Sequence, residues 1–234
     1  MDWRAQLDRL PVTRRQVFVG AALGGGLAVR WAGAGYPVVL GSRSSEKAAR
    51  AAQKIDTGNN AHPVHGTDNN SAAARSDIVI ITVPFANHSA ILQEISSVIA
   101  GKIVVDATVP LMPPKVGTVQ LPTAGSAASL TQDALGERAD VVAAFHNVAA
   151  DKLRNPGPID CDVLVCGNKK TARQRVIKLV EALGMRGLHA GPIANSAAAE
   201  ALTSVIITIN RLYKVDGAGI RITGDFTAPD TDSA

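Results

Sequence analysis

The sequence has few aromatic residues and few cysteines, and both shortages exclude classes of protein. Aromatic residues make up 3% of the 234 residues, which is too few for a nucleic-acid surface built on base stacking. The two cysteines, Cys161 and Cys166, cannot form a disulfide framework, and no cysteine–histidine group has the spacing of a zinc site. We therefore expect no nucleic-acid partner, no metal and a reducing compartment.

Long apolar runs and blocks of like charge are also missing. Apolar residues make up 46% of the chain, yet no run of them reaches the ~18 residues of a membrane span. The net charge is +4, and the lysines and arginines are scattered along the chain. This distribution favours a soluble protein that binds small anions rather than a polyanion or a membrane.

The N-terminal region offers two interpretations. Thr13-Arg14-Arg15-Gln16-Val17-Phe18-Val19 resembles a twin-arginine export signal, because apolar, glycine-rich sequence follows it. Arg30 would lie inside the apolar part of such a signal, and the same residues also fit a first strand, turn and helix. We favour the second interpretation and regard residues 1–14 as an N-terminal extension.

From residue 16 onward, apolar runs alternate with helical patterns, which predicts an α/β fold of the Rossmann type, a doubly wound parallel sheet. Its predicted strands cover residues 16–20, 36–41, 62–65, 77–84, 102–107 and 140–145. Its predicted helices cover residues 23–34, 45–55 with Ser44 or Ser45 as the cap, and 87–99.

The pattern changes after residue 150, so we expect two domains. Residues 15–150 are predicted to form the Rossmann domain, and residues 151–224 a small, helical C-terminal domain. Residues 225–234 read as a flexible tail. In the smaller domain we expect strands at 162–166 and 185–189 and helices at 171–183 and 195–213. A proline- and glycine-rich loop at 110–126 is long enough to suggest a functional role.

The turn after the first strand predicts a phosphate-binding site. Its glycines would let backbone N–H groups and a helix N-terminus approach a pyrophosphate. Gly20, Ala22 and Gly25 can be aligned with G-x-G-x-x-G, or Gly20 and Gly24 can close a shorter loop. Neither alignment gives the full pattern, so a flexible turn of small residues remains an alternative. The candidate residues are Gly20, Ala22, Leu23, Gly24 and Gly25.

The second strand indicates which dinucleotide would bind. NAD-binding folds end this strand with an acidic residue that holds the ribose hydroxyls, and no acid stands at the tip here. Ser42, Arg43 and Lys47 could instead hold a 2′-phosphate through charge-assisted hydrogen bonds. A solvated helix start is the alternative interpretation of these bases, and we favour the phosphate site and hence NADP(H).

The chain resembles the NADPH-dependent reductases of the deazaflavin coenzyme F420. The matching stretches fall in order and cover most of residues 17–224. They are GLAVRWAGAGYPVVLGSRS (26–44), DIVIITVP (77–84), LPTAGSAA (121–128), VVAAFHNVAA (141–150), DCDVLVCG (160–167), HAGPIANS (189–196) and NRLYKVDGAGIRITG (210–224).

The resemblance implies hydride transfer between NADPH and the deazaflavin, held in a cleft between the two domains of a cytoplasmic homodimer. It places the nicotinamide at Val83 and Pro84, with Phe85 and Ala86 beside them, and the stacked rings at His146, Asn147 and Val148. In that alignment Val148 would set the spacing between the rings. Compared with the family pattern, the glycine loop lacks about two residues and a threonine.

Hydride transfer needs two rings held close together in a dry cleft, and it needs no nucleophile or metal. We therefore expect no essential catalytic side chain. Two alternatives remain open from the sequence. The chain could reduce another acceptor, such as a flavin, ferric ion or imine, or the shortened loop could leave a catalytically silent deazaflavin-binding homologue.

Overall fold

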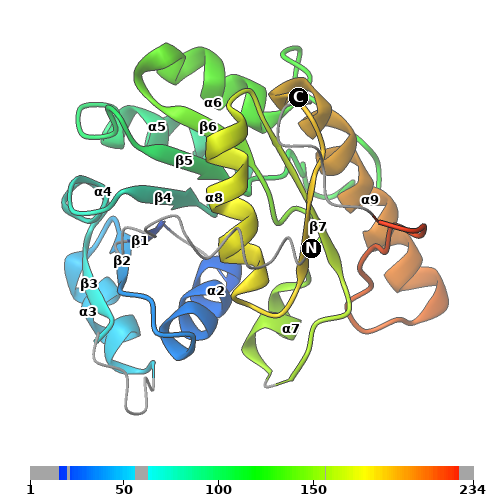
Figure 1. Ribbon diagram of the computed structural model, residues 1–234, viewed down its shortest axis with the longest axis horizontal. Coiled ribbons are helices and arrows are strands. Elements are labelled where there is room, and N and C mark those ends of the chain that lie inside the picture. The colour runs from blue at the N-terminus through cyan, green and yellow to red at the C-terminus, as the bar shows by residue number, and fades with distance from the viewer. Residues whose placement is uncertain (1–15, 20–21, 56–62, 156, 227–234) are drawn as a thin grey trace.

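Eight strands form one continuous sheet in the order β3-β2-β1-β4-β5-β6-β7-β8 (Figure 1). The protein is seen here in a computed structural model that describes residues 16–19, 22–55, 63–155 and 157–226. The strands are β1 (Gln16–Val19), β2 (Val38–Ser42), β3 (His65–Asp68), β4 (Ile78–Ile81), β5 (Ile103–Asp106), β6 (Asp140–Ala143), β7 (Asp162–Gly167) and β8 (Arg186–His189). The first six run parallel in the order of a dinucleotide-binding sheet.

Helices cover both faces of the sheet because its strands are apolar on both faces. Successive side chains of a strand point to opposite faces, and in β4 Ile78 and Ile80 belong to one buried cluster whereas Val79 and Ile81 belong to the other. The first cluster includes residues of α2 (Ala22–Gly33), α3 (Ser45–Gln53), α7 (Ala150–Arg154) and α8 (Lys170–Glu181). The second includes residues of α4 (Asn69–Ala74), α5 (His88–Ile95) and α6 (Ala127–Leu135).

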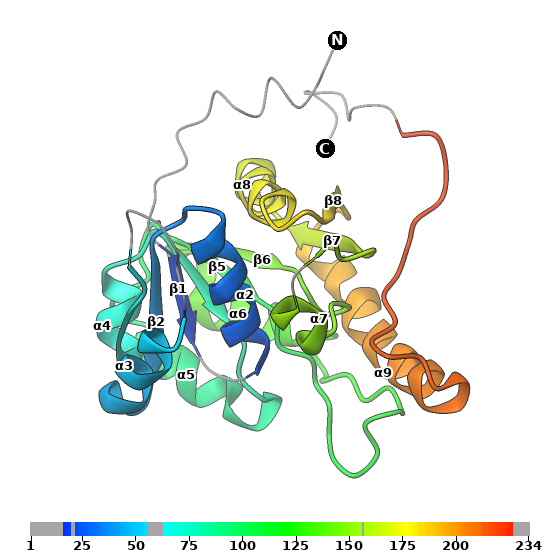
Figure 2. The same ribbon diagram turned by 90° about the horizontal axis from the view of Figure 1, so that it is seen from below.

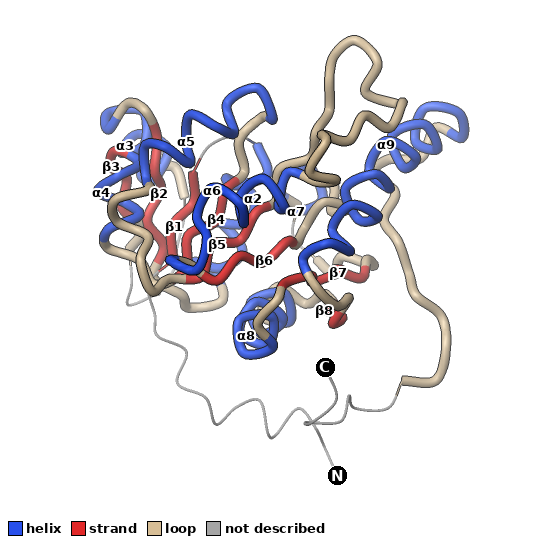
Figure 3. Tube along the Cα trace, turned by 90° about the horizontal axis from the view of Figure 1, so that it is seen from above, coloured by secondary structure: helices blue, strands red, loops and turns tan. Residues whose placement is uncertain are grey.

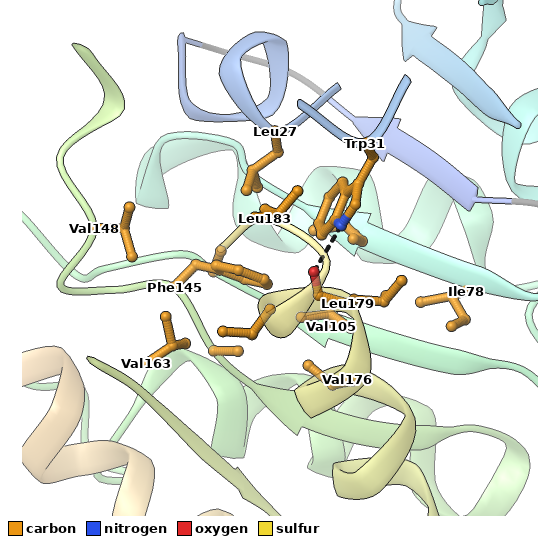
Figure 4. Packing of buried hydrophobic residues seen from close by; sticks show 14 of the residues in the cluster. Leu27, Trp31, Ile78, Val105, Phe145, Val148, Val163, Val176, Leu179 and Leu183 are labelled. Atoms are coloured by element: carbon orange, nitrogen blue, oxygen red, sulfur yellow. Dashed lines mark hydrogen bonds between the residues drawn. The ribbon is translucent and has the colours of Figure 1, made fainter. Parts of the chain in front are cut away.

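The C-terminal part of the chain extends this sheet. β7 pairs antiparallel with β6, and β8 pairs parallel with β7. Helix α8 packs on the same face as α2, where the indole N–H of Trp31 donates to the carbonyl of Leu179 at 2.8 Å (Figure 4). Residues on both sides of position 150 therefore share one core, and the division into domains at that position stays a prediction.

Arg30, the charge that argued against an export signal, has a structural role in α2. Its guanidinium donates to the carbonyls of Lys152, Leu153, Asn155 and Gly157 at 2.7–3.0 Å. These carbonyls lie at and just beyond the end of α7, where a helix leaves acceptors without partners. Arg30 thereby fixes the end of α7, and the segment that follows it, against α2.

The loop predicted at 110–126 lies beside the long helix α9 (Ser196–Tyr213), as Figures 2 and 3 show. The hydroxyl of Ser204 donates to the carbonyl of Thr118 at 3.4 Å, and that of Thr208 donates to the carbonyl of Gly117 at 3.1 Å. A Cβ at Gly117 would come within 2.9 Å of the Thr208 hydroxyl. A glycine is therefore needed where the loop approaches α9 most closely.

The structure corrects several expected elements. Helices α4, α6 and α7 were not predicted, because each is short and rich in alanine or polar residues, which leaves little apolar periodicity. The third strand covers His65–Asp68 rather than 62–65, of which residue 62 lies outside the described residues. Ser44 is the cap of α3, as its hydroxyl accepts from the N–H of Lys47.

Across the described parts of the chain, no helix is long and apolar enough to cross a membrane.

Candidate functional site

The predicted site residues gather at the carboxyl edge of the parallel strands. The chain crosses from β1 to β2 on one side and reaches β4 on the other, so the strand order reverses between β1 and β4. Ligands of open α/β sheets bind in the crevice at such a switch point. The segments after β1, β2, β4 and β6 all begin at this edge, which brings together four stretches that are far apart in sequence.

After β1, only residues 20 and 21 separate the strand from α2. Gly20 lies outside the described residues, and Ala22 opens the helix. Leu23 packs against the core. A Cβ at Gly24 would lie 2.6 Å from the Thr82 hydroxyl, whereas a Cβ at Gly25 would meet nothing within 4 Å. Gly24 therefore allows α2 to pack against the segment after β4, and Gly25 borders open space.

At the end of β2, Arg43 and Lys47 are exposed and Ser42 is half-buried. The Ser42 hydroxyl accepts from the N–H of Ser44 at 3.3 Å, which bends the chain into α3. Within the described part of the chain, neither the Arg43 guanidinium nor the Lys47 ammonium has an ion-pair partner. Two uncommitted bases and a hydroxyl therefore stand at the edge where the sequence predicts a phosphate.

One acid lies close to these bases. Asp68 stands beside Ser42 in the β2–β3 register. Its carboxylate caps α4, accepting from the N–H of Ser71 at 2.8 Å, and these hydrogen bonds lower the pKa of Asp68. Because the carboxylate is used as a helix cap, it does not take the place of the ribose-binding acid at the tip of β2.

At the end of β4, the chain turns outward at Pro84. Val83 is half-buried and Pro84 is exposed, and the short 3-10 helix at Phe85–Asn87 leads from them into α5. Phe85 stacks on His88, with ring centroids 6.0 Å apart. The segment predicted to face the nicotinamide is thus a partly apolar surface at the carboxyl edge of the sheet.

After β6, a tight turn holds the residues predicted to contact the stacked rings. Phe145 has a φ of +71°, an unusual conformation for a bulky residue. The N–H of Val148 donates back to the Phe145 carbonyl at 3.2 Å. The side chains of Phe145 and Val148 both point into the core, as Figure 4 shows. Anchored at both ends, the turn tolerates its strained backbone.

Asn147 secures the same turn to β7. Its side-chain amide donates to the carbonyl of Asp162 at 2.7 Å and to the Cys161 sulfur at 3.0 Å. Burial is the main reason why the pKa of the Cys161 thiol is raised, so this cysteine is a hydrogen-bonding core residue rather than a nucleophile. Asn147 therefore holds the turn in place, a role that the sequence did not indicate.

His146 is buried, and neither of its ring nitrogens has a hydrogen-bond partner among the residues that the structure describes. Burial lowers its pKa to about 4, although the charge of Asp106 acts in the opposite direction. The imidazole is therefore neutral near pH 7 and keeps one donor and one acceptor. A buried polar ring without partners is uncommon, which makes His146 a candidate for contact with a ligand.

Two buried carboxyl groups near His146 were missed from the sequence. Glu200 of α9 has a fully buried side chain, with an oxygen 3.9 Å from the His146 Nε2 atom. Asp106, at the end of β5, lies 2.7 Å from the His88 Nε2 atom and accepts from the Thr131 hydroxyl. Both could have been noticed, since each is a single acid within an apolar or alanine-rich run.

The two carboxyl groups have opposite pKa shifts. Burial alone would raise the pKa of Asp106, but hydrogen bonds and the charge of His88, with bonds from Thr131 and Thr108, hold it below its ordinary value. Burial raises the pKa of Glu200 to about 8, which its two backbone hydrogen bonds only partly offset. Near neutral pH, Asp106 is thus a carboxylate and Glu200 a carboxylic acid.

A pocket of about 320 Å³ opens beside the turn after β6. Asn147, Ala149 and Cys161 line one side, and the glycine-rich segment 217–219 lines the other. Lys152 on its wall pairs with Asp216 at 3.2 Å. Among the side chains that can be placed, no three His, Cys, Asp or Glu groups are arranged to hold a metal.

The sequence of this chain is similar to those of known proteins. The family model for coenzyme F420-dependent NADP oxidoreductases matches residues 17–110. The F420-dependent NADP reductase of Methanocaldococcus jannaschii is 37% identical over 210 residues, or 86% of this chain and 93% of the relative. The chain belongs to this reductase family. The family member from Methanothermobacter thermautotrophicus is also 37% identical, over 85% of this chain and 89% of the relative.

A solved structure supports the fold of this family member. A protein from Arthrobacter sp. FB24, provisionally assigned as an F420-dependent NADP reductase, superimposes with a TM-score of 0.76. It covers 90% of this chain and 99% of its own length at 24% identity. The Rossmann-type sheet predicted from the sequence is thereby confirmed, whereas its continuation through β7 and β8 was not predicted.

Proposed function

We propose that the protein transfers a hydride between NADPH and the deazaflavin coenzyme F420 by direct contact of the two rings. The observation that carries the proposal is 37% identity to an F420-dependent NADP reductase over 93% of that protein's length. When bound, the two coenzymes supply the redox chemistry, so the protein has to bind them, orient their rings and exclude water.

The dinucleotide would bind along the carboxyl edge from β2 to β4. Arg43 and Lys47 are uncommitted, exposed bases that suit a 2′-phosphate, with the Ser42 hydroxyl beside them. The N-terminus of α2 and the open space beside Gly25 suit the pyrophosphate. Val83 and Pro84 then present an apolar edge for the nicotinamide.

The deazaflavin would lie against the turn after β6 and in the adjoining pocket. Val148 is 7% exposed, so it offers only an edge to a ligand, and the His146 side chain lies directly behind this surface, fully buried. The unpartnered nitrogens of His146 suit a polar group on a ring. Lys152 is the one base among the residues that line the described pocket, and Arg221 is engaged with Asp160 and Asp162.

The direct test is to mix purified protein with NADPH and oxidised coenzyme F420 and to follow the loss of the deazaflavin's visible absorbance. We expect rapid bleaching with NADPH and much slower bleaching with NADH. Arg43→Ala should lower this preference, whereas Arg50→Ala, which changes another exposed arginine near the end of α3, should not.

A catalytically silent deazaflavin binder is the second candidate function. The observation that favours it is the short connection between β1 and α2, which leaves only residues 20 and 21 for a glycine loop. Deazaflavin binding without NADPH binding or bleaching would establish this function. Failure to bind either coenzyme would reject both candidates.

A homodimer in the cytoplasm completes the proposal. Large apolar side chains are exposed on α9 and on the neighbouring loop, and a second copy of the chain would cover them. They are Val205, Ile209, Leu212 and Tyr213 of the helix and Met112, Val119 and Leu121 of the loop. Light scattering should give twice the mass of the chain, and Leu212→Glu should give a monomer. Cell fractionation would test the location.

A further inference from the structure

Glu200 connects helix α9 to the N-terminus of α6. Its Oε2 atom accepts from the N–H of Ala127 at 2.7 Å, and its Oε1 atom accepts from the N–H of Ala128 at 3.1 Å. The Ser126 hydroxyl accepts from the next free N–H, that of Ser129, at 2.9 Å. The first turn of α6 thus receives its hydrogen-bond acceptors from a helix that is 73 positions away in the chain.

The same carboxyl group faces His146. The Oε1 atom lies 3.9 Å from the His146 Nε2 atom, just beyond hydrogen-bond distance, and it is the oxygen with the longer backbone bond. A carboxylic acid that carries its proton on Oε1 would keep both backbone contacts and direct its O–H towards the imidazole. Helix α9 also holds the turn directly, because the Thr203 hydroxyl donates to the His146 carbonyl at 2.9 Å.

We propose that Glu200 is the positioning residue for His146, a neutral acid that holds the imidazole through a proton on Oε1. This inference rests on the proposed function, in which His146 meets a coenzyme ring. It explains why a carboxyl group stands at this buried position. A helix cap alone needs only an acceptor, whereas orienting the ring also requires a donor directed at it.

The groups around the pair favour a neutral acid. Asp106 on β5 contributes a negative charge that raises the pKa of Glu200, in addition to the larger effect of burial. Cys166 on β7 is also near, and burial raises the pKa of its thiol to about 11, so it stays uncharged. His88 faces Asp106 rather than Glu200. Within the described segments, Lys and Arg side chains form no ion pair with Glu200, and the His146 Nε2 atom lies 3.9 Å from it. The buried Arg173 of α8 acts on Cys166 and donates to the Gly167 carbonyl.

The proposal can be tested on the protein without coenzymes by NMR of the histidine ring nitrogens between pH 6 and pH 9.5. Single substitutions of the histidines assign the signals. We expect the His146 signals to shift with a midpoint near pH 8, where Glu200 loses its proton. In Glu200→Gln this step should be absent, while Ser204→Ala, one turn further along α9, should retain it.

Two results would overturn the proposal: wild-type His146 signals that do not change near pH 8, or a step that persists unchanged in Glu200→Gln. The wild-type titration is informative even if that variant fails to fold. A helix cap that did not hold the ring would shift these signals only through the field of its new charge, and the tautomer read from the Nδ1 and Nε2 signals would stay the same across the step.

A second measurement links the pair to the coenzyme. Wild-type affinity for oxidised coenzyme F420 should fall about three- to tenfold as pH rises through 8. The reason is that Glu200 then loses the proton with which it holds the His146 imidazole against the coenzyme ring. Glu200→Gln should bind with little pH dependence. If neither protein binds the coenzyme, the proposed function fails, and the NMR titration still decides the role of Glu200.

Discussion

Two polar regions lie at the carboxyl edge of the sheet. At the end of β2, the polar residues stand within six positions of one another and lie at the surface. At the ends of β5 and β6, the polar groups come from distant segments of the chain and are buried. Ser42, Arg43 and Lys47 depend on one strand end and one helix start. His146, Asp106 and Glu200 depend on β5, β6 and α9 being packed together. We therefore expect the fold to tolerate substitutions in the first region better than in the second.

The difference follows from solvation. Exposed bases keep their ordinary charge and interact weakly with the rest of the protein. Buried groups lose hydration, so their charge states depend on neighbouring groups, and their removal leaves partners unsatisfied. Substitutions at the β2 edge should therefore affect ligand binding, and those at the buried edge should affect stability as well.

The largest effect is expected at Asp106. Asp106→Ala leaves the His88 Nε2 atom and the N–H of Thr108 without their acceptor, and we expect a loss of about 3–5 kcal/mol in the free energy of unfolding. Urea denaturation would measure it. The matched control is Asp140→Ala, whose partner is the exposed Lys169 at 2.6 Å, with an expected loss below about 1 kcal/mol. Equal losses would remove the contrast between the two regions.

The second prediction concerns the pH dependence of stability. The folded pKa of His146 is about 4 against an ordinary value of 6.5, so its contribution to stability is present above pH 6.5 and is lost as pH falls through 4. Glu200, with its raised pKa, acts oppositely: its contribution is lost as pH rises from about 4.5 to 8.

A difference measurement separates these two effects. Relative to wild type, His146→Gln should gain about 3 kcal/mol in the free energy of unfolding between pH 7 and pH 4. His65→Gln, which changes an exposed histidine, should follow the wild type. A constant difference across this range would mean that His146 is not buried in its neutral form.

The third prediction concerns the exposed region. Arg43→Ala should weaken NADPH binding by about 2 kcal/mol, roughly 30-fold, because a charge-assisted contact to the 2′-phosphate is lost. NADH binding and the free energy of unfolding should change by less than about 0.5 kcal/mol. Fluorescence titration and urea denaturation would check this, with Arg50→Ala as the control. An equal loss of NADH affinity would argue against a 2′-phosphate site.

The smallest effect is expected at Gly25. Alanine meets nothing within 4 Å there, so Gly25→Ala should stabilise the helix by about 0.5–1 kcal/mol. The added methyl group would stand where the pyrophosphate is proposed, and NADPH affinity should fall. Gly24→Ala is the counterpart, because its Cβ would lie 2.6 Å from the Thr82 hydroxyl and should destabilise the fold. Unchanged NADPH affinity in Gly25→Ala would place the cofactor elsewhere.

Much of the sheet was predictable because its signals are local. The apolar runs that form β4 and β5 have no polar alternation, and each is buried on both faces. In the segment Ser42–Lys47, the polar residues and the helix cap Ser44 are all within six positions, so the signal is local. Helix α6 was missed because it has little apolar periodicity, and the acceptor for its first two N–H groups, Glu200, comes from a distant part of the chain. The contact of Asn147 with a ligand stays a prediction, and the role that the sequence did not indicate is the hydrogen bond by which its amide holds the turn.

The sequence by itself determined the alternation of strands and helices, the bases that follow the second strand and the family to which the chain belongs. Each of these features depends on residues that are close together in the sequence, or on motifs that occur in a fixed order along the chain. Only the tertiary structure decided that His146 is neutral and without partners, that Asp106 is ionised and that Glu200 is an acid facing the imidazole. The physical reason is that a charge state depends on the solvent and neighbours that folding brings to a group, and these come from any part of the chain.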